Sequence, residues 1–134
     1  MENKDLNLEK LKGISALLVH AAKIDGEYSG KEKNIILNFL NNFTEDNSMK
    51  EKILNDAELL ESDSNQILDF TNTIKKDSIE SKSIVIKELW KIIISNNETD
   101  EYESNLMRRV CGLIYFPDKL SGEIKLKLKE ELKN

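Results

Sequence analysis

A segment of this chain recurs 71 positions later, and this internal repeat constrains the fold more than any other feature. Residues 25–32 align with residues 96–103, so that Glu32 falls on Glu103. The flanking apolar positions keep the same register, since Ile14, Leu18, Ala21, Ala22, Ile35, Ile36, Phe39 and Leu40 align with Val85, Leu89, Ile92, Ile93, Leu106, Met107, Val110 and Cys111. A fixed period is the signature of repeated structural units. The sequence therefore predicts two related helix-turn-helix units.

Apolar residues recur at spacings of three and four almost throughout the chain, which is the pattern of amphipathic α-helices. We predict an all-α protein whose 134 residues form a single compact domain of about seven helices. The expected helices cover residues 6–23, 29–43, 48–60, 67–74, 79–95, 100–113 and a last stretch after Pro117. The segment 79–95, which includes Ile84, is the most apolar and is expected to be the most buried helix. Leu60 is expected to point inward from the third helix.

The charge distribution excludes several classes of protein. The net charge is -5 and acidic and basic residues are interspersed, so the chain offers no basic stripe for nucleic acid. The first residues are charged and no apolar run reaches the roughly 20 residues that span a bilayer, so we expect a soluble, cytoplasmic protein without direct membrane insertion. A single cysteine fits a reducing compartment.

The two repeated turns are rich in carboxylates, which are the hard oxygen ligands that Ca²⁺ and Mg²⁺ prefer. The candidate metal ligands are Asp25, Glu27 and Glu32 in the first turn and Glu98, Asp100 and Glu103 in the second. Neither turn is an EF-hand loop, because Ile36 and Met107 stand where that loop needs a bidentate glutamate. Acidic side chains held close together favour a compensating cation or a lysine.

Helix capping explains most of the same residues without any ligand. Gly26 or Asn97 supplies a left-handed residue at the end of one helix. Ser29 with Glu32 forms a Ser-x-x-Glu capping box that opens the next helix, and Asp100 with Glu103 repeats it. Capping leaves Asp25, Glu27 and Glu98 unexplained, so both interpretations stand.

Several segments resemble the TerB-like domain, which is named for a tellurite-resistance protein. They are residues 17–27, Phe70-Thr71, Leu89-Trp90, residues 98–103 and residues 107–110, and the resemblance covers about residues 11–118. It implies an all-helical fold of about seven helices and a divalent-cation site at the acidic residues of both turns. Relatives of this domain occur fused to DnaJ-type co-chaperones and in membrane-associated stress systems. The chain departs from the family pattern at Asn96 and Asn97, where the second turn would read Asp-Gly.

Other reactive side chains are expected to be structural. His20 lies off the apolar stripe of its helix and is expected to be partly exposed. Cys111 lies on an apolar helix face and is expected to be buried and inert. Trp90 adjoins Leu89 and Ile93 and is expected in or near the core. Because no phosphate loop, catalytic triad or thiolate zinc pattern is present, we expect no enzymatic activity.

Three hypotheses follow. The first is a non-enzymatic cytoplasmic module that binds a divalent cation at its acidic turns and acts in stress response. The second is an interaction or co-chaperone-associated domain without metal, which would bind a protein partner through a groove between helices or an exposed patch near Tyr28, Tyr102 and Phe116. The third, least favoured, is a carboxylate-based metal hydrolase, which would need two ions and an open coordination position.

Overall fold

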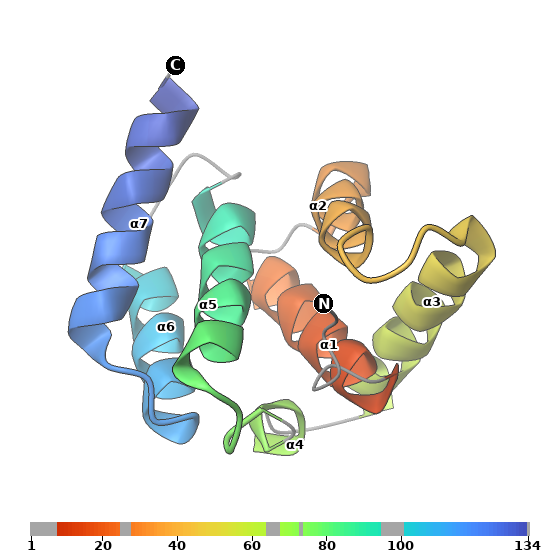
Figure 1. Cartoon of the computed structure of the whole chain (residues 1–134), viewed down its shortest axis with the longest axis horizontal. Helices are drawn as coiled ribbons and strands as arrows, with labels where there is room; N and C mark the ends of the chain where they lie inside the picture. Colours follow the sequence, from red (N-terminus) through yellow and green to blue (C-terminus); the bar gives the residue numbers. More distant parts are fainter. Residues whose placement is uncertain (1–7, 25–27, 64–67, 73, 95–100, 134) are drawn as a thin grey trace.

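The computed structural model describes residues 8–24, 28–63, 68–72, 74–94 and 101–133. These residues form six long helices and one short helix, with no strand among them (Figure 1). The helices are α1 (Leu8–Ile24), α2 (Gly30–Leu40), α3 (Asn47–Asp63), α4 (Leu68–Thr71), α5 (Ile79–Ile94), α6 (Glu101–Leu113) and α7 (Asp118–Lys133). The predicted all-α, single-domain fold of about seven helices is confirmed.

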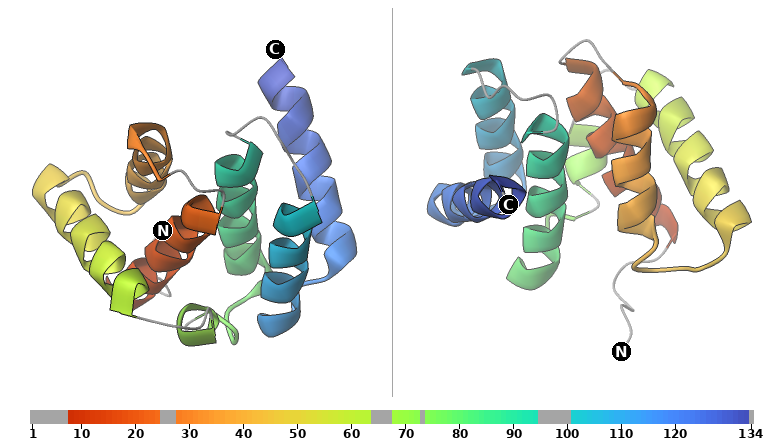
Figure 2. Two further views of the ribbon diagram at one scale, coloured as in Figure 1. Left: turned by 180° about the vertical axis from the view of Figure 1, so that it is seen from behind. Right: turned by 90° about the horizontal axis from the view of Figure 1, so that it is seen from above.

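The two longest apolar helices, α1 and α5, lie side by side in the middle of the molecule (Figure 1). Helix α3 packs on the outer side of α1, and α7 packs on the outer side of α5. Helix α2 packs against α1, α3 and α5, and helix α6 packs against α4, α5 and α7 (Figure 2). One continuous core of apolar side chains joins all of these helices. Within the described residues, no helix is both long enough and apolar enough to cross a bilayer.

The structure confirms the internal repeat and extends it to a third pair of helices. Helices α1, α2 and α3 each begin 71 positions before α5, α6 and α7 respectively. We call α1–α3 the first unit and α5–α7 the second unit. All the repeated apolar positions are buried except the half-buried Ile35. The α3/α7 pair was not predicted, because few of its apolar positions are shared.

Two predictions about packing are wrong. Leu60 is 39% exposed, although it was expected to point inward, and Ile84 is 38% exposed, although it belongs to the helix that was expected to be the most buried. Helix α1 has more buried residues than α5, because small residues such as Gly13 and Ala16 let its neighbours approach on more than one side. The most buried helix is therefore α1.

Helix α6 ends in a left-handed residue that is not glycine. Tyr115 has a φ of 60°. The N–H of Phe116 donates to the carbonyl of Cys111 at 2.8 Å, and the N–H of Tyr115 donates to the carbonyl of Gly112 at 3.4 Å. This is a Schellman motif, which satisfies carbonyls that a helix end leaves open. It turns the chain so that Phe116 enters the core before α7 begins, and the expectation that Phe116 belongs to an exposed patch is therefore wrong.

Candidate functional site

The structure describes the side chain of one of the six candidate metal ligands. That residue is Glu32, which lies in the first turn of α2. Glu103 lies in the first turn of α6, but its side chain is outside the described part of the structure. The remaining candidates lie outside the described residues altogether: Asp25, Glu27, Glu98 and Asp100. That these carboxylates come together at each turn is still a prediction.

The predicted capping box at the start of α2 is confirmed. Ser29 has extended backbone angles and lies directly before the helix, with Glu32 at its third position. The backbone N–H of Ser29 donates to Glu32 Oε1 at 3.0 Å, and the Ser29 hydroxyl donates to the same oxygen at 2.6 Å. The Ser29 side chain in turn accepts from the backbone N–H of Glu32. These bonds satisfy donors that a helix N-terminus leaves open.

Capping accounts for only one oxygen of the Glu32 carboxylate. Both Ser29 donors converge on Oε1, and Oε2 is buried without a hydrogen-bond partner among the described residues. The whole residue is 0% exposed. Burial raises the pKa of Glu32, but the Ser29 donors, its own backbone N–H and the charge of Lys31 together bring the pKa below its ordinary value. Glu32 is therefore a buried carboxylate with one oxygen unpaired among the described residues, and it lies five residues after the acidic segment 25–27.

Helix α3 brings a further glutamate to this region that the sequence did not single out. Glu61 accepts from Lys23 Nζ at 2.8 Å, and its other oxygen lies 3.1 Å from His20 Nδ1. Its side chain is only 10% exposed. Burial raises the pKa of Glu61. The hydrogen bonds and charges of Lys23 and His20 lower the pKa by more than burial raises it, so the pKa falls below its ordinary value. Glu61 therefore fastens the last turns of α1 to α3.

A second glutamate of α3 fastens the start of α2. The hydroxyl of Tyr28 donates to Glu58 Oε2 at 2.5 Å, and Lys33 Nζ lies 3.6 Å from the same oxygen. Burial, followed by the bond to Glu58 and the charges of Glu58 and Glu61, raises the pKa of Tyr28. The amphipathic pattern of α3 placed Ala57 inward but gave no sign of which helices would lie beside it. The carboxylates of Glu58 and Glu61 have hydrogen-bond or ionic partners in the chain, whereas Oε2 of Glu32 has none among the described residues.

Taken alone, the described residues do not complete a metal centre. Within them, no three His, Cys, Asp or Glu side chains come together as a ligand cluster. Any ion held by Glu32 would therefore need the neighbouring residues 25–27, which the structure does not describe.

The other reactive side chains have structural environments, as predicted. His20 is half-buried, with its ring centroid 6.4 Å from that of Phe70. Burial raises the pKa of Cys111, whose side chain is 1% exposed. Trp90 is 4% exposed, and its indole N–H donates to the Ser121 hydroxyl at 3.0 Å. The burial of Cys111 fits the expected packing role of this residue.

Comparison with known proteins identifies the family. The family model described as tellurite resistance protein TerB matches residues 12–126, which is most of the chain. No curated protein and no solved structure matches. The matched segment begins in α1 and ends in α7, so it contains both units and both turns. The chain belongs to the TerB family.

Proposed function

We propose that this TerB-family domain is a non-enzymatic cytoplasmic module that binds a divalent cation, Ca²⁺ or Mg²⁺, at the turn between α1 and α2. The observation that supports this function is the vacant Oε2 of Glu32, a buried carboxylate whose pKa lies below its ordinary value. The second turn, with Glu98, Asp100 and Glu103, supplies the related site. Membership of the family extends the proposal to a role in stress response together with a protein partner.

Oε2 of Glu32 costs the metal-free fold free energy, because it is buried without a hydrogen-bond partner among the described residues. A buried acceptor without a partner costs about 1–3 kcal/mol, and more when it is charged. Of the three nearby lysines, Lys23 and Lys33 pair with Glu61 and Glu58, and Lys31 acts on Glu32 through its charge without donating a hydrogen bond to Oε2. A hard cation coordinated by Glu32 and by oxygens of Asp25 and Glu27 would remove that cost.

The experiment is a thermal melt of metal-stripped protein titrated with Ca²⁺, Mg²⁺, Mn²⁺ and Zn²⁺. At a hundredfold excess over the dissociation constant, binding to the native state should add about 2.7 kcal/mol to the free energy of unfolding. The decisive variant is Glu32→Gln. Glutamine closes a capping box as glutamate does, but it carries no charge. We expect the metal-free variant to melt close to the wild type and to lose the metal-dependent rise.

Asp25→Asn and Glu98→Gln complete the series and test each turn separately. Loss of the rise in Asp25→Asn alone would restrict the site to the first turn. If no ion stabilises the wild type, cation binding is wrong. The capping box would then account for Glu32, and the alternative function would stand: an interaction or co-chaperone-associated domain that works without metal.

A further inference from the structure

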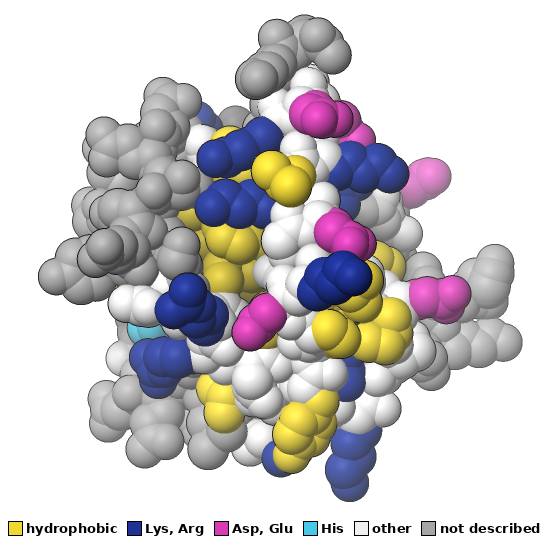
Figure 3. Space-filling view, turned by 90° about the vertical axis from the view of Figure 1, so that its left-hand side faces the viewer, with side chains coloured by type: hydrophobic (Ala, Val, Ile, Leu, Met, Phe, Trp, Pro, Cys, Tyr) yellow, Lys and Arg dark blue, Asp and Glu magenta, His cyan; other side chains and the backbone are white. Residues whose placement is uncertain are grey.

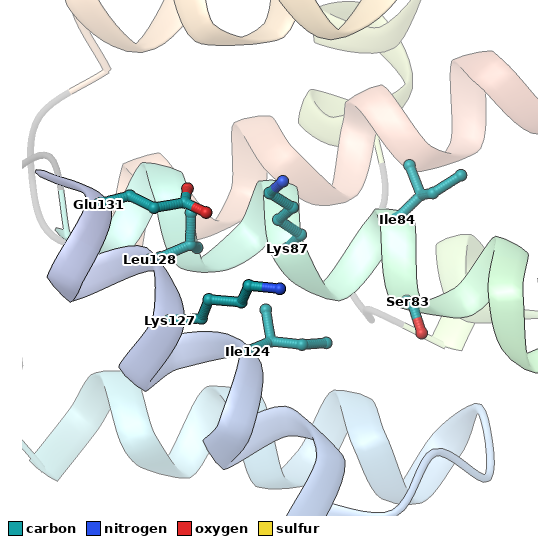
Figure 4. A pocket seen from close by; sticks show the side chains of 7 residues that line it. All are labelled: Ser83, Ile84, Lys87, Ile124, Lys127, Leu128 and Glu131. Carbon is teal, nitrogen blue, oxygen red and sulfur yellow. The ribbon is translucent and has the colours of Figure 1, made fainter.

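The helices of the second unit leave a groove between them that the first unit closes. The groove lies between α5 and α7 and has a volume of about 250 Å³. It is lined by Ser83, Ile84, Lys87, Ile124, Lys127, Leu128 and Glu131 (Figure 4). All seven residues occupy repeat positions whose counterparts, 71 places earlier, lie on α1 and α3.

In the first unit, small side chains let these two helices approach closely. Gly13 and Ala16 of α1 are buried, and so is Ala57 of α3. Their counterparts in the second unit are the larger Ile84, Lys87 and Leu128. With these larger side chains, α5 and α7 pack less extensively than α1 and α3, and Ile84 remains 38% exposed.

The charges of the two interfaces differ as well. In the first unit, Lys12 Nζ lies 3.2 Å from Asp56 and the pair spans α1 and α3. The corresponding residues of the second unit are Ser83 and Lys127, so the carboxylate has been replaced by an ammonium group. Lys87 adds a second ammonium group from the opposite wall (Figure 4). Neither lysine forms an ion pair within the described residues.

We propose that the groove between α5 and α7 docks an acidic amphipathic helix of a partner protein. Apolar side chains of that helix would contact Ile84, Ile124 and Leu128, and its carboxylates would pair with Lys87 and Lys127. An amphipathic helix in an apolar groove is a common mode of peptide recognition. In the first unit both charges of the ion pair come from the chain itself, whereas here the partner would supply the carboxylates.

The size and shape of the groove favour this occupant over others. Its volume of about 250 Å³ is below the roughly 300–1,000 Å³ of small-molecule sites, and suits a few anchoring side chains. Basic and apolar side chains mix on the face that α7 presents, with acidic side chains among them (Figure 3). A flat anionic membrane would not reach Leu128, which is 3% exposed at the bottom of the groove. A second copy of α3 is also a poor match, because Glu58 and Glu61 are already paired.

The test uses the full chain labelled with ¹⁵N and two synthetic helical peptides of about 15 residues. Both peptides carry leucines at positions i, i+3, i+4 and i+7, with glutamates beside them in one and lysines in the other. We expect saturable shift changes along α5 and α7 with the acidic peptide only. Reversing both charges in Lys87→Glu/Lys127→Glu should weaken binding more than about tenfold, because like charges then face each other.

Two further variants test whether peptide binding depends on the groove itself or only on the overall charge of the protein. Ser83→Lys/Lys127→Asp transplants the ion pair of the first unit and should also abolish docking, while its circular dichroism and melting temperature show that it folds. Lys129→Glu makes the same change of charge on an exposed site of α7 outside the groove and should bind as the wild type does. Equal binding of both peptides, or wild-type affinity in the double reversal, would overturn the proposal. So would groove-dependent self-association, or groove-dependent binding to phosphatidylserine vesicles without peptide binding.

Discussion

The two units of this TerB-family protein share a framework and differ in their charges. Their helices begin at the same repeat positions, and their core residues are buried at the same positions. In the first unit, α3 presents Glu58 and Glu61 to basic groups of α1 and α2 and to the hydroxyl of Tyr28, which lies just before α2. In the second unit, Lys129 occupies the position of Glu58, and Lys127 that of Asp56. The comparison shows that apolar register maintains a repeated fold while the charged positions diverge.

The largest test asks whether the two cores are equivalent. Leu18 and Leu89 occupy the same repeat position on α1 and α5, and both are 0% exposed. Leu18→Ala and Leu89→Ala should each lower the free energy of unfolding by about 3 kcal/mol, because each leaves a cavity that its neighbours fill only partly. Denaturant unfolding of both variants measures the two losses. A loss in one variant less than half that in the other would mean that the units do not share the core equally.

A smaller effect is expected from the ionic link that Glu61 makes in the first unit. Glu61→Gln should lower the free energy of unfolding by about 1–2 kcal/mol, because Lys23 and His20 lose a charged partner. Glu123→Gln, at an exposed position of α7, is the matched control and should change little.

The Glu61→Gln variant also tests how the free energy of unfolding depends on pH. Because the pKa of Glu61 is lowered in the folded state, its contribution is complete above the ordinary value of 4.5 and is lost as the pH falls through the lower folded value. The difference in unfolding free energy between wild type and Glu61→Gln should therefore shrink below about pH 4.5. A constant difference down to strongly acidic pH would show that the carboxylate acts through packing rather than through charge.

The fold was predictable from sequence because the apolar positions carry the repeat. Pairs such as Leu18/Leu89 and Phe39/Val110 kept a common register across two helices and the turn between them. The third pair, α3/α7, escaped notice because Leu60 aligns with Glu131 and Asp56 with Lys127. The exposure of Ile84 was missed for a related reason. Its apolar character indicates burial, but it lines a groove whose presence depends on how α5 and α7 pack together.

The candidate site was only partly predictable. The Ser-x-x-Glu spacing sufficed to predict that Ser29 and Glu32 cap α2. The vacancy at Oε2 could not be predicted, because it depends on both Ser29 donors choosing one oxygen and on neighbours that bury the other. Glu58 and Glu61 were missed because periodicity assigns a residue to a face of its own helix, and not to the helix it will meet.

The smallest effect concerns how the corresponding helices α2 and α6 end. Helix α6 ends with Tyr115 in the left-handed conformation, whereas its counterpart Thr44 donates its N–H to the carbonyl of Leu40 at 3.2 Å and has no positive φ. Tyr115→Gly should raise the free energy of unfolding by about 0.5–1 kcal/mol, because glycine adopts that conformation without strain. The exposed contact with Lys75, whose Nζ lies 5.6 Å from the Tyr115 ring centroid, offsets part of this gain. Thr44→Gly should lower stability instead, because it adds only flexibility to the unfolded chain. Chemical unfolding of the two variants side by side measures both signs, and a gain in both would mean that the two helix ends are not different after all.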